Sequence, residues 1–328
     1  MQSSRPARWS RSFSVVGLGC WQLGGDWGDV DDEVSQQILT AAADSGTNFF
    51  DTADVYGDGR SERSLGRFLA SRSDRERLTV ATKMGRRADP HVPEAYTLDN
   101  FRAWTDRSRG NLGVDTLDLV QLHCPPPEVF HDPRVFEALA TIVEEGRVRA
   151  VGVSVETVEQ GLAAIGEGGV VSIQVIVNLF RRKPLERLVT EAKSAGVAII
   201  ARVPLASGLL SGRYDEATVF PANDHRNYNR SGAAFDIGET FSGVPYEIGV
   251  AAAREVAALT PAGWTTAQLA LRWLLDSGVD TVIPGASTPE QARANAAVGE
   301  FPAVDDVTQA ALAEVYNRLI RPHVHARW

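Results

Sequence analysis

Short apolar runs alternate with longer amphipathic stretches of helical period through most of this chain, and the alternation restricts the possible folds severely. The short runs have the length and composition of strands, and the longer ones have the length of helices. Strands that alternate with helices form parallel sheets, because each helix carries the chain back across the sheet. Eight strands are predicted, at Phe13–Leu18, Asn48–Phe50, Leu78–Thr82, Leu117–Leu122, Arg149–Val153, Val171–Val177, Val197–Val203 and Thr281–Ile283.

Helical segments separate these runs, and several end at a glycine, the residue that most readily takes the left-handed conformation that ends helices. They are predicted at Asp32–Ala43, Ser61–Ala70, Leu98–Leu112, Pro133–Glu144, Thr157–Ile165, Leu185–Ala195, Thr266–Leu275 and Pro289–Ala297. A chain of 328 residues suits one (β/α)8 barrel of about 250 residues with extra loops. We therefore predict an α/β fold, a single TIM barrel domain over residues 1–328 with a long loop after strand 7 and a C-terminal tail.

Two segments interrupt the alternation. Residues 205–246 lack a clear period and are rich in Gly, Asn, Asp and Ser, so we predict a long loop over a cofactor and substrate site. Residues 301–328 are predicted as a C-terminal helix and a tail that either caps the barrel mouth or frays. A doubly wound sheet is the rival fold, but its G-x-G-x-x-G turn is missing after the early strands.

Composition excludes several classes of protein. No apolar run approaches the ~18 residues of a membrane span, and the polar, basic N-terminus has no apolar stretch typical of a secretory signal, so a cytoplasmic location is expected. A net charge of −9 opposes a general nucleic-acid surface. Cys20 and Cys124 lie in no metal-ligand spacing, so no metal site is expected. The sequence leaves the oligomeric state open, including a homo-oligomer.

Four polar residues follow predicted strands: Asp51 and Tyr56 after the second, Lys83 after the third and His123 after the fourth. Since the residues after each strand face the same rim of such a barrel, we expect these side chains to meet there. Reduction of a carbonyl by a nicotinamide hydride needs a phenol as proton donor, a cation to lower the pKa of that phenol, and a group that polarises the carbonyl. The four residues supply this chemistry.

The motifs that carry these residues resemble the aldo-keto reductases. The strongest runs from Gly46 to Gly57, and others are Thr82-Lys83, Gln121-Leu-His123, Gly146–Ser154, Pro204–Gly212 and Ile283-Pro-Gly-Ala. The resemblance extends from about Val15 to Asn295 and implies NAD(P)H-dependent reduction of a small aldehyde or ketone. It implies that Tyr56 is the general acid, that Lys83 lowers its pKa, that Asp51 holds Lys83, and that His123 binds the carbonyl.

The same resemblance implies a set of cofactor-binding residues: Ser154 and Gln174 for the carboxamide, Arg202 beside the nicotinamide, Leu205, Ser207 and Gly208 for the pyrophosphate, and Gly285, Ser287, Gln291 and Asn295 toward the adenosine. The chain departs from the family where Val155 replaces a common Asn and where Arg202 replaces an aromatic. Beside an oxidised, cationic nicotinamide the guanidinium of Arg202 would be repelled, so we expect a preference for the neutral reduced cofactor. Family members often carry a Lys or Arg directly after Ile-Pro, but here Arg293 is the nearest cation, which predicts a weak site for a 2′-phosphate. The resemblance still implies NADPH, with NADH open.

The substrate pocket is expected to include Trp21, Trp27, Met84 and Cys124. Other functions remain open at this stage. A weak phosphate site permits an NAD-linked sugar or alcohol dehydrogenase, and some relatives are nucleotide-binding regulatory subunits, such as potassium-channel β subunits. A barrel aldolase in which Lys83 forms a Schiff base is a further alternative.

Overall fold

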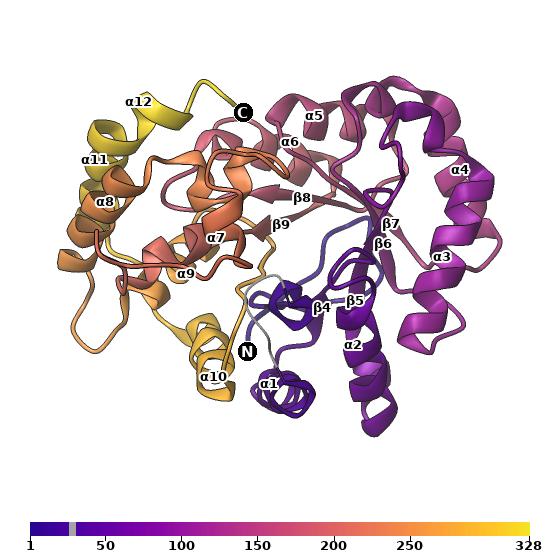
Figure 1. Ribbon diagram of the computed structural model, residues 1–328, viewed down its shortest axis with the longest axis horizontal. Coiled ribbons are helices and arrows are strands. Elements are labelled where there is room, and N and C mark those ends of the chain that lie inside the picture. Colours follow the sequence, from indigo (N-terminus) through magenta and orange to yellow (C-terminus); the bar gives the residue numbers. More distant parts are fainter. Residues whose placement is uncertain (26–30) are drawn as a thin grey trace.

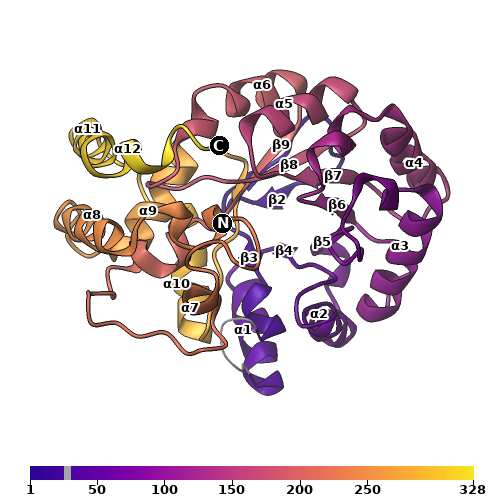
Figure 2. The ribbon, with the colours of Figure 1, turned by 45° about the horizontal axis from the view of Figure 1, so that its top comes forward.

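The computed structural model describes residues 1–25 and 31–328 and contains an eight-stranded parallel sheet curved into a barrel (Figures 1 and 2). The strands follow one another around the sheet in chain order. Parallel bridges between Val16 and Val282 and between Gly19 and Gly285 join the first strand to the last. The strands are β3 (Leu18–Gly19), β4 (Phe49–Asp51), β5 (Thr79–Met84), β6 (Leu119–His123), β7 (Val151–Ser154), β8 (Ser172–Ile176), β9 (Ala198–Arg202) and β10 (Thr281–Val282). The predicted barrel is confirmed.

Helices surround the sheet on its outer side (Figure 2). Their apolar faces pack on the strands in one large core, as amphipathic helices of this fold require. They are α1 (Asp32–Asp44), α2 (Arg60–Ser71), α3 (Leu98–Leu112), α4 (Pro133–Glu144), α5 (Val158–Glu167), α6 (Leu188–Ala195), α8 (Tyr246–Ala258), α9 (Thr266–Asp276) and α10 (Pro289–Ala297). All were predicted within a few residues except α8, an additional helix that breaks the regular alternation of strand and helix.

The first predicted strand is divided in two, which corrects the prediction for Phe13–Leu18. Phe13–Ser14 forms β2 and pairs antiparallel with β1 (Ser3–Ser4), whereas Leu18–Gly19 forms the barrel strand β3 and Val16 adds a single parallel bridge to β10. The rings of Trp9, Phe13 and Phe49 lie 5.2 to 6.2 Å apart and pack with apolar side chains from the barrel strands. Aromatic packing therefore occupies the end of the barrel where the strands begin, and the polar residues gather where they end.

The segment 205–246 is less irregular than predicted. It contains the short helices η6 (Ala206–Ser211), α7 (His225–Tyr228), η7 (Ile237–Glu239) and η8 (Phe241–Gly243). After α10 come η9 (Val298–Glu300), α11 (Asp306–Val315), η10 (Tyr316–Ile320) and α12 (Arg321–Val324). The tail ends with Trp328, whose buried ring packs on Arg181 at 4.0 Å and beside the glycines of η7 and η8. The tail thus contacts the long segment.

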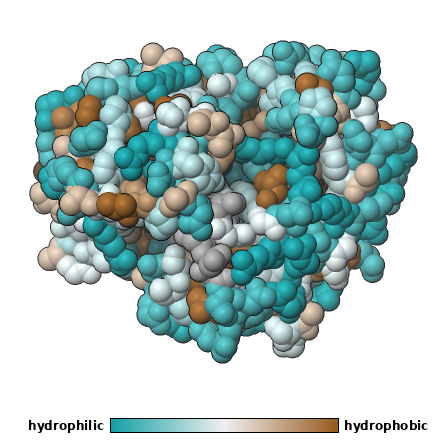
Figure 3. Space-filling view, viewed as in Figure 1, coloured by the Kyte–Doolittle hydropathy of each residue, from teal (hydrophilic) through white to brown (hydrophobic). Residues whose placement is uncertain are grey.

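One face of the molecule carries hydrophobic side chains only as scattered groups among polar ones (Figure 3). Among the described residues, the exposed large hydrophobic side chains are those of Val219, Tyr228 and Val307. Scattered apolar residues of this kind are normal on a protein surface. None of the described helices is both long and apolar enough to cross a membrane.

Candidate active site

Lys83 lies at the centre of the predicted constellation. Its Nζ donates hydrogen bonds to Asp51 Oδ1 at 2.5 Å and to the Thr52 carbonyl at 2.9 Å, and it lies 3.4 Å from the Tyr56 hydroxyl. The ring of His123 lies 6.0 Å from that of Tyr56, edge to face. The ends of β4, β5 and β6 position these groups, because parallel strands end at the same rim. The four side chains are brought together as predicted.

Burial and charge oppose each other at Tyr56 and Lys83. Burial lowers the pKa of Lys83, but Asp51 and Tyr56 outweigh it, so the pKa of Lys83 is raised and the ammonium stays charged. Burial raises the pKa of Tyr56 to about 12, although Lys83 acts to lower it. Lys83 thus acts on the pKa of Tyr56 in the predicted direction, but the loss of solvent around the phenol outweighs the effect of one ammonium.

His123 is neutral, because burial first and then Arg86, Lys83 and Arg202 hold its pKa well below the usual value. Its Nε2 lies 3.4 Å from Nη1 of Arg86. Since a guanidinium can only donate, this contact requires the imidazole proton on Nδ1. Nδ1 is buried and has no hydrogen-bond partner among residues 1–25 and 31–328. In this arrangement the donor next to Nε2 is Arg86, which the sequence analysis did not identify.

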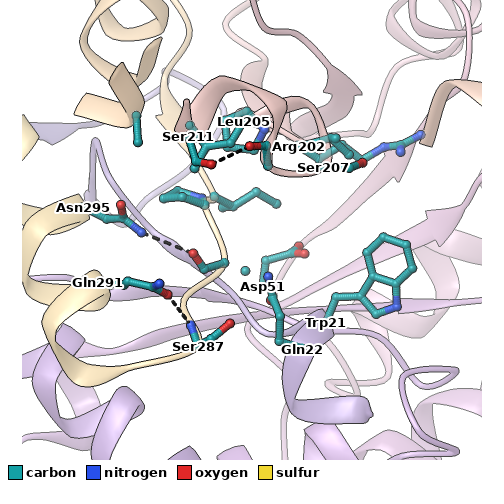
Figure 4. A pocket seen from close by; sticks show the side chains of 18 of the residues that line it. Trp21, Gln22, Asp51, Arg202, Leu205, Ser207, Ser211, Ser287, Gln291 and Asn295 are labelled. Atoms are coloured by element: carbon teal, nitrogen blue, oxygen red, sulfur yellow. Dashed lines mark hydrogen bonds between the residues drawn. The ribbon is translucent and has the colours of Figure 1, made fainter. Parts of the chain in front are cut away.

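A cavity of about 370 Å³ opens above these residues and extends toward α10. Figure 4 shows Trp21, Arg202 and Ser207 on one side of it and Gln291 and Asn295 on the other. Most of the predicted cofactor residues line this cleft: Gln174, Arg202, Leu205, Ser207, Gly208, Gly285, Ser287, Gln291 and Asn295. Asp51, Tyr56 and His123 line it too, so the predicted cofactor and catalytic groups share one cavity.

Two predicted carboxamide ligands are placed differently. Gln174 lines the cleft, but its Nε2 donates to Asp51 Oδ2 at 2.7 Å. The amide therefore supports the carboxylate that holds Lys83. Ser154 does not line the cleft, and its Oγ lies 3.6 Å from Cys124 Sγ. The hydroxyl of Ser154 thus contacts the neighbouring strand end, and its carboxamide role stays a prediction.

The phosphate-side segment has its own internal bonds. Ser207 Oγ donates to the Glu239 carbonyl at 3.1 Å and accepts from the Phe241 N–H at 3.0 Å, so this hydroxyl ties η6 to the segment that follows and does not point to a ligand. Gly208 has φ 95°, which favours glycine. At Gly285 a side chain would have its Cβ only 1.8 Å from Gln22 Nε2. Glycine at this position leaves room at the floor of the cleft.

Arg202 belongs to a buried charge network. Its guanidinium lies 3.1 Å from Glu156 Oε2 and 3.7 Å from Glu239 Oε1. Arg86 Nη1 also lies 2.9 Å from Glu239 Oε1. Glu239 is buried, yet Arg86 and Arg202 lower its pKa to about 2. The charge of Arg202 is therefore compensated, which removes the basis for the predicted repulsion of an oxidised nicotinamide.

Cys124, Glu156 and Glu239 also come together, with potential ligand atoms within 4.8 Å of one another. Arg202 lies among them, because its Nη2 is 3.6 Å from Cys124 Sγ as well as 3.1 Å from Glu156. Burial raises the pKa of the Cys124 thiol to about 12, so the thiol is protonated at neutral pH. The guanidinium already provides the positive charge that these carboxylates need.

The predicted substrate wall is placed in part. Trp21 lines the cleft and stacks on Tyr56 with 5.9 Å between ring centroids. Met84 is fully buried and does not line the cleft, which corrects the prediction for Met84. Cys124 is partly exposed and lies 3.6 Å from Arg202, a lining residue, and its place in a substrate pocket stays a prediction. Trp27 lies outside the described residues.

Arg213 and Arg226, both from the long segment 205–246, also line the cleft. Arg226 is paired with Asp224, whereas Arg213 is exposed and forms no ion pair with the described part of the chain. Arg293, the cation considered from sequence, does not line the cleft and lies 3.3 Å from Glu290. The sequence did offer a sign that Arg213 would lie at the cleft, because Arg213 directly follows the Pro204–Gly212 motif.

Comparison with known proteins gives a consistent family. The model of the Aldo/keto reductase family matches residues 15–316. Aldo-keto reductase YhdN of Bacillus subtilis is 30% identical over 288 residues, which cover 86% of this chain and 83% of that protein. Aldo-keto reductase yakc [NADP(+)] of Schizosaccharomyces pombe is 28% identical, with 83% and 79% covered.

A solved structure, the glycerol dehydrogenase AKR11B4 from Gluconobacter oxydans, has a TM-score of 0.78 at 28% identity and covers 98% of this chain and 96% of its own. The fold, the shared cleft and the match over nearly the whole sequence agree. This chain therefore belongs to the aldo/keto reductase family, whose members are oxidoreductases that use nicotinamide cofactors to reduce carbonyl groups.

Proposed function

We propose that this protein reduces an aldehyde or ketone to an alcohol with a reduced nicotinamide cofactor, with Tyr56 as the proton donor. The observation that carries the proposal is Lys83 Nζ, which lies 2.5 Å from Asp51 and 3.4 Å from the Tyr56 hydroxyl beside an open cleft. An ammonium in this position stabilises the tyrosinate that proton donation leaves behind.

The cleft fits an anionic dinucleotide. Among the described residues, the lining includes the guanidinium groups of Arg202, Arg213 and Arg226 and the carboxylates of Asp51 and Glu239. Both carboxylates are paired with cations, and Arg202 and Arg226 are paired with carboxylates, so Arg213 is the lining cation without an ion pair in the described chain. Leu205, Gly208, Gly285, Ser287, Gln291 and Asn295 would hold the cofactor along the rest of the cleft. The bound cofactor supplies the hydride.

The protein's own groups move and position the proton. Tyr56 donates its hydroxyl proton to the carbonyl oxygen, Lys83 stabilises the resulting phenolate, and Asp51 keeps Lys83 charged and in place. The pKa of Tyr56, about 12, keeps the phenol protonated over the neutral range, as proton donation requires. The guanidinium of Arg86, which lies beside Nε2 of the neutral His123, would place a further N–H donor near the carbonyl.

The geometry argues against a Schiff base at Lys83. The nitrogen of a nucleophilic amine must be deprotonated, and desolvation without a counter-ion is the usual means. Here the ammonium contacts Asp51, and its pKa is raised. The contact with Asp51 and the raised pKa therefore favour a role for Lys83 as a fixed cation.

NADPH is the cofactor we propose, because Arg213, which forms no ion pair within residues 1–25 and 31–328, offers a cation for a phosphate, and because a relative is named for NADP(+). The reverse reaction uses the same groups, and a structural relative is named a glycerol dehydrogenase, so alcohol oxidation belongs to the same proposal.

The test is to mix the purified protein with NADPH or NADH and a panel of aldehydes and ketones, and to follow the loss of the reduced nicotinamide. Turnover of at least one carbonyl, with the alcohol identified as product, is expected. If the protein binds the cofactor but neither reduces any carbonyl of the panel nor oxidises any of the corresponding alcohols, the proposal is contradicted. That result would favour a nucleotide-binding regulatory subunit.

A further inference from the structure

Tyr56 stands at the start of a tight loop between β4 and α2. The three residues that follow it, Gly57, Asp58 and Gly59, all have positive φ values, of 56°, 52° and 82°. Asp58 takes this left-handed conformation without being glycine, and such a conformation persists only where the surroundings determine it. The place of the Tyr56 backbone therefore depends on the contacts that hold this loop.

The loop packs directly on η1 (Trp21–Gly24) through two glycines. A Cβ on Gly57 would lie only 2.1 Å from the carbonyl oxygen of Gly24, and a Cβ on Gly24 would lie 2.7 Å from the carbonyl carbon of Tyr56. Glycine at both positions permits this close approach of two backbones. The loop therefore has no room to move toward η1.

Arg107, from α3, holds the same loop by hydrogen bonds. Its Nη1 donates to the Asp54 carbonyl at 3.2 Å, and its Nη2 donates to the Asp58 carbonyl at 3.2 Å and to Asp58 Oδ1 at 2.8 Å. Arg63 and Arg87 also contact Asp58. The guanidinium of Arg107 thus bridges the main chain two residues before Tyr56 and two residues after it. Its rigid fork of N–H donors suits such a bridge, whereas the ammonium of a lysine is a single point charge.

The distance between Tyr56 and Lys83 depends on this loop. Lys83 is fixed by its bonds to Asp51 at 2.5 Å and to the Thr52 carbonyl at 2.9 Å. The Tyr56 hydroxyl lies 3.4 Å from Lys83 Nζ, which is already long for a hydrogen bond. A small shift of the loop would therefore separate the phenol from the cation that stabilises its anion. A misplacement of about 1 Å at a reacting group can lower the rate about 100-fold.

We propose that Arg107 is a positioning residue for the proton transfer, because its bridge between the Asp54 and Asp58 carbonyls keeps the Tyr56 hydroxyl beside Lys83. This inference rests on the proposed function, in which Tyr56 donates the proton. Arg107 is not one of the described residues that line the cleft. It therefore acts through Tyr56 and contacts neither the substrate nor the cofactor.

The test is a double-mutant cycle in single turnover. Enzyme with bound NADPH is mixed with a carbonyl compound that wild type reduces, and the loss of the reduced nicotinamide gives the rate of the chemical step. Arg107→Ala should lower this rate about 10- to 100-fold, while the Kd for NADPH stays within about twofold. In a Tyr56→Phe background, Arg107→Ala should change the residual rate by less than about twofold, because the hydroxyl through which Arg107 acts is already missing.

Arg102→Ala is the matched control for this cycle. Arg102 lies on the same helix as Arg107 and is similarly exposed, at 38% against 31% of the side chain, but it pairs with Asp99 and Glu145. Arg102→Ala should therefore keep the wild-type rate in both backgrounds.

A second variant separates positioning from folding. Arg107→Lys keeps a cation beside Asp58, yet its ammonium has no fork to span both carbonyls, so its rate should also fall about 10-fold or more. Near-ultraviolet circular dichroism establishes that each variant is folded. A wild-type rate in either folded variant, or an equal loss in the wild-type and Tyr56→Phe backgrounds, would overturn this inference while the proposed function stands. If wild type reduces no carbonyl, or reduces it no faster than Tyr56→Phe, the proposed proton donor and this inference both fail.

Discussion

Lys83 carries a buried positive charge, and neighbouring strands supply the carboxylate that balances it and the amide that supports this carboxylate. Asp51 accepts from it directly, and Gln174 donates to the other carboxylate oxygen at 2.7 Å. Breaking a buried pair leaves an uncompensated charge, which costs more than the pair itself contributes. The identity of Asp51, Lys83 and Tyr56 could be predicted from strand-end positions. The hydrogen bond from Gln174 to Asp51 could not be predicted, because the partner that Gln174 takes depends on side-chain directions across the barrel.

Asp54 provides a test of buried charge by pH. Its Oδ1 is buried without a hydrogen-bond partner in the described residues, and burial together with Glu62 raises its pKa to about 7. Because the folded pKa lies above the unfolded value of about 4, stability is full at low pH and falls as pH rises toward 7. In Asp54→Asn this loss disappears. The free energy of unfolding, measured with urea, should therefore fall between pH 5 and pH 8 by about 2 kcal/mol less in the variant than in wild type.

An equal decline in the two proteins between these pH values would show that the Asp54 carboxylate is not the group responsible. Because other groups also titrate in this range, the comparison uses the difference between wild type and variant at each pH.

The segment between β9 and α8 is where sequence analysis predicted least. It was predicted as one loop, but it forms four short helices that depend on contacts between distant residues, such as Ser207 Oγ with the Phe241 N–H. Ser207, Phe241 and Ser242 have positive φ values without being glycine. Such conformations persist only where the surroundings determine them, so local propensity does not reveal them.

Trp328 is expected to hold part of this segment. Its ring packs on Arg181 at 4.0 Å, its Nε1 donates to Asp236 Oδ2 at 3.4 Å, and it fills the space beside Gly238 and Gly243. In Trp328→Ala, backbone amides from Asp236 to Val244 should exchange with solvent at least 10-fold faster, while strand amides keep their wild-type rates. Hydrogen exchange with mass spectrometry measures this, and Val307→Ala, at an exposed site in the same region, is the control. If these amides exchange at the wild-type rate in Trp328→Ala, contacts other than those of Trp328 stabilise the segment.

The barrel as an assembly was predictable because its signal is repeated along the chain. The alternation of apolar runs and helical stretches specifies a parallel sheet even when one strand boundary is predicted wrongly. The division of Phe13–Leu18 between β2 and β3 therefore did not change the predicted fold. Arg86, Glu239 and Arg213 lie in stretches without such a period. The places of Glu239 and Arg213 in the cleft, and of Arg86 beside His123 and Glu239, arise from how the loops pack on the finished barrel, and no pattern in the sequence reports that.

A protein with a net charge of −9 needs local cations to bind an anionic cofactor. Arg213 lines the cleft without an ion pair in the described chain, whereas Arg293 is paired with Glu290 outside it. Arg213→Ala should raise the Kd for NADPH about 10-fold or more, since hydrogen bonds to phosphate are charge-assisted. Arg293→Ala should leave the Kd unchanged. Titration of tryptophan fluorescence gives both values, and a loss of affinity in Arg293→Ala alone would contradict this placement of the phosphate.

The proton donor is tested most directly by Tyr56→Phe, assayed beside wild type with the best carbonyl substrate and saturating cofactor. Loss of a general acid lowers kcat by about 10²- to 10⁴-fold, while the Kd for NADPH should stay within about twofold because the ring remains to pack against Trp21. If both proteins instead reduce the carbonyl at the same rate, Tyr56 does not supply the proton.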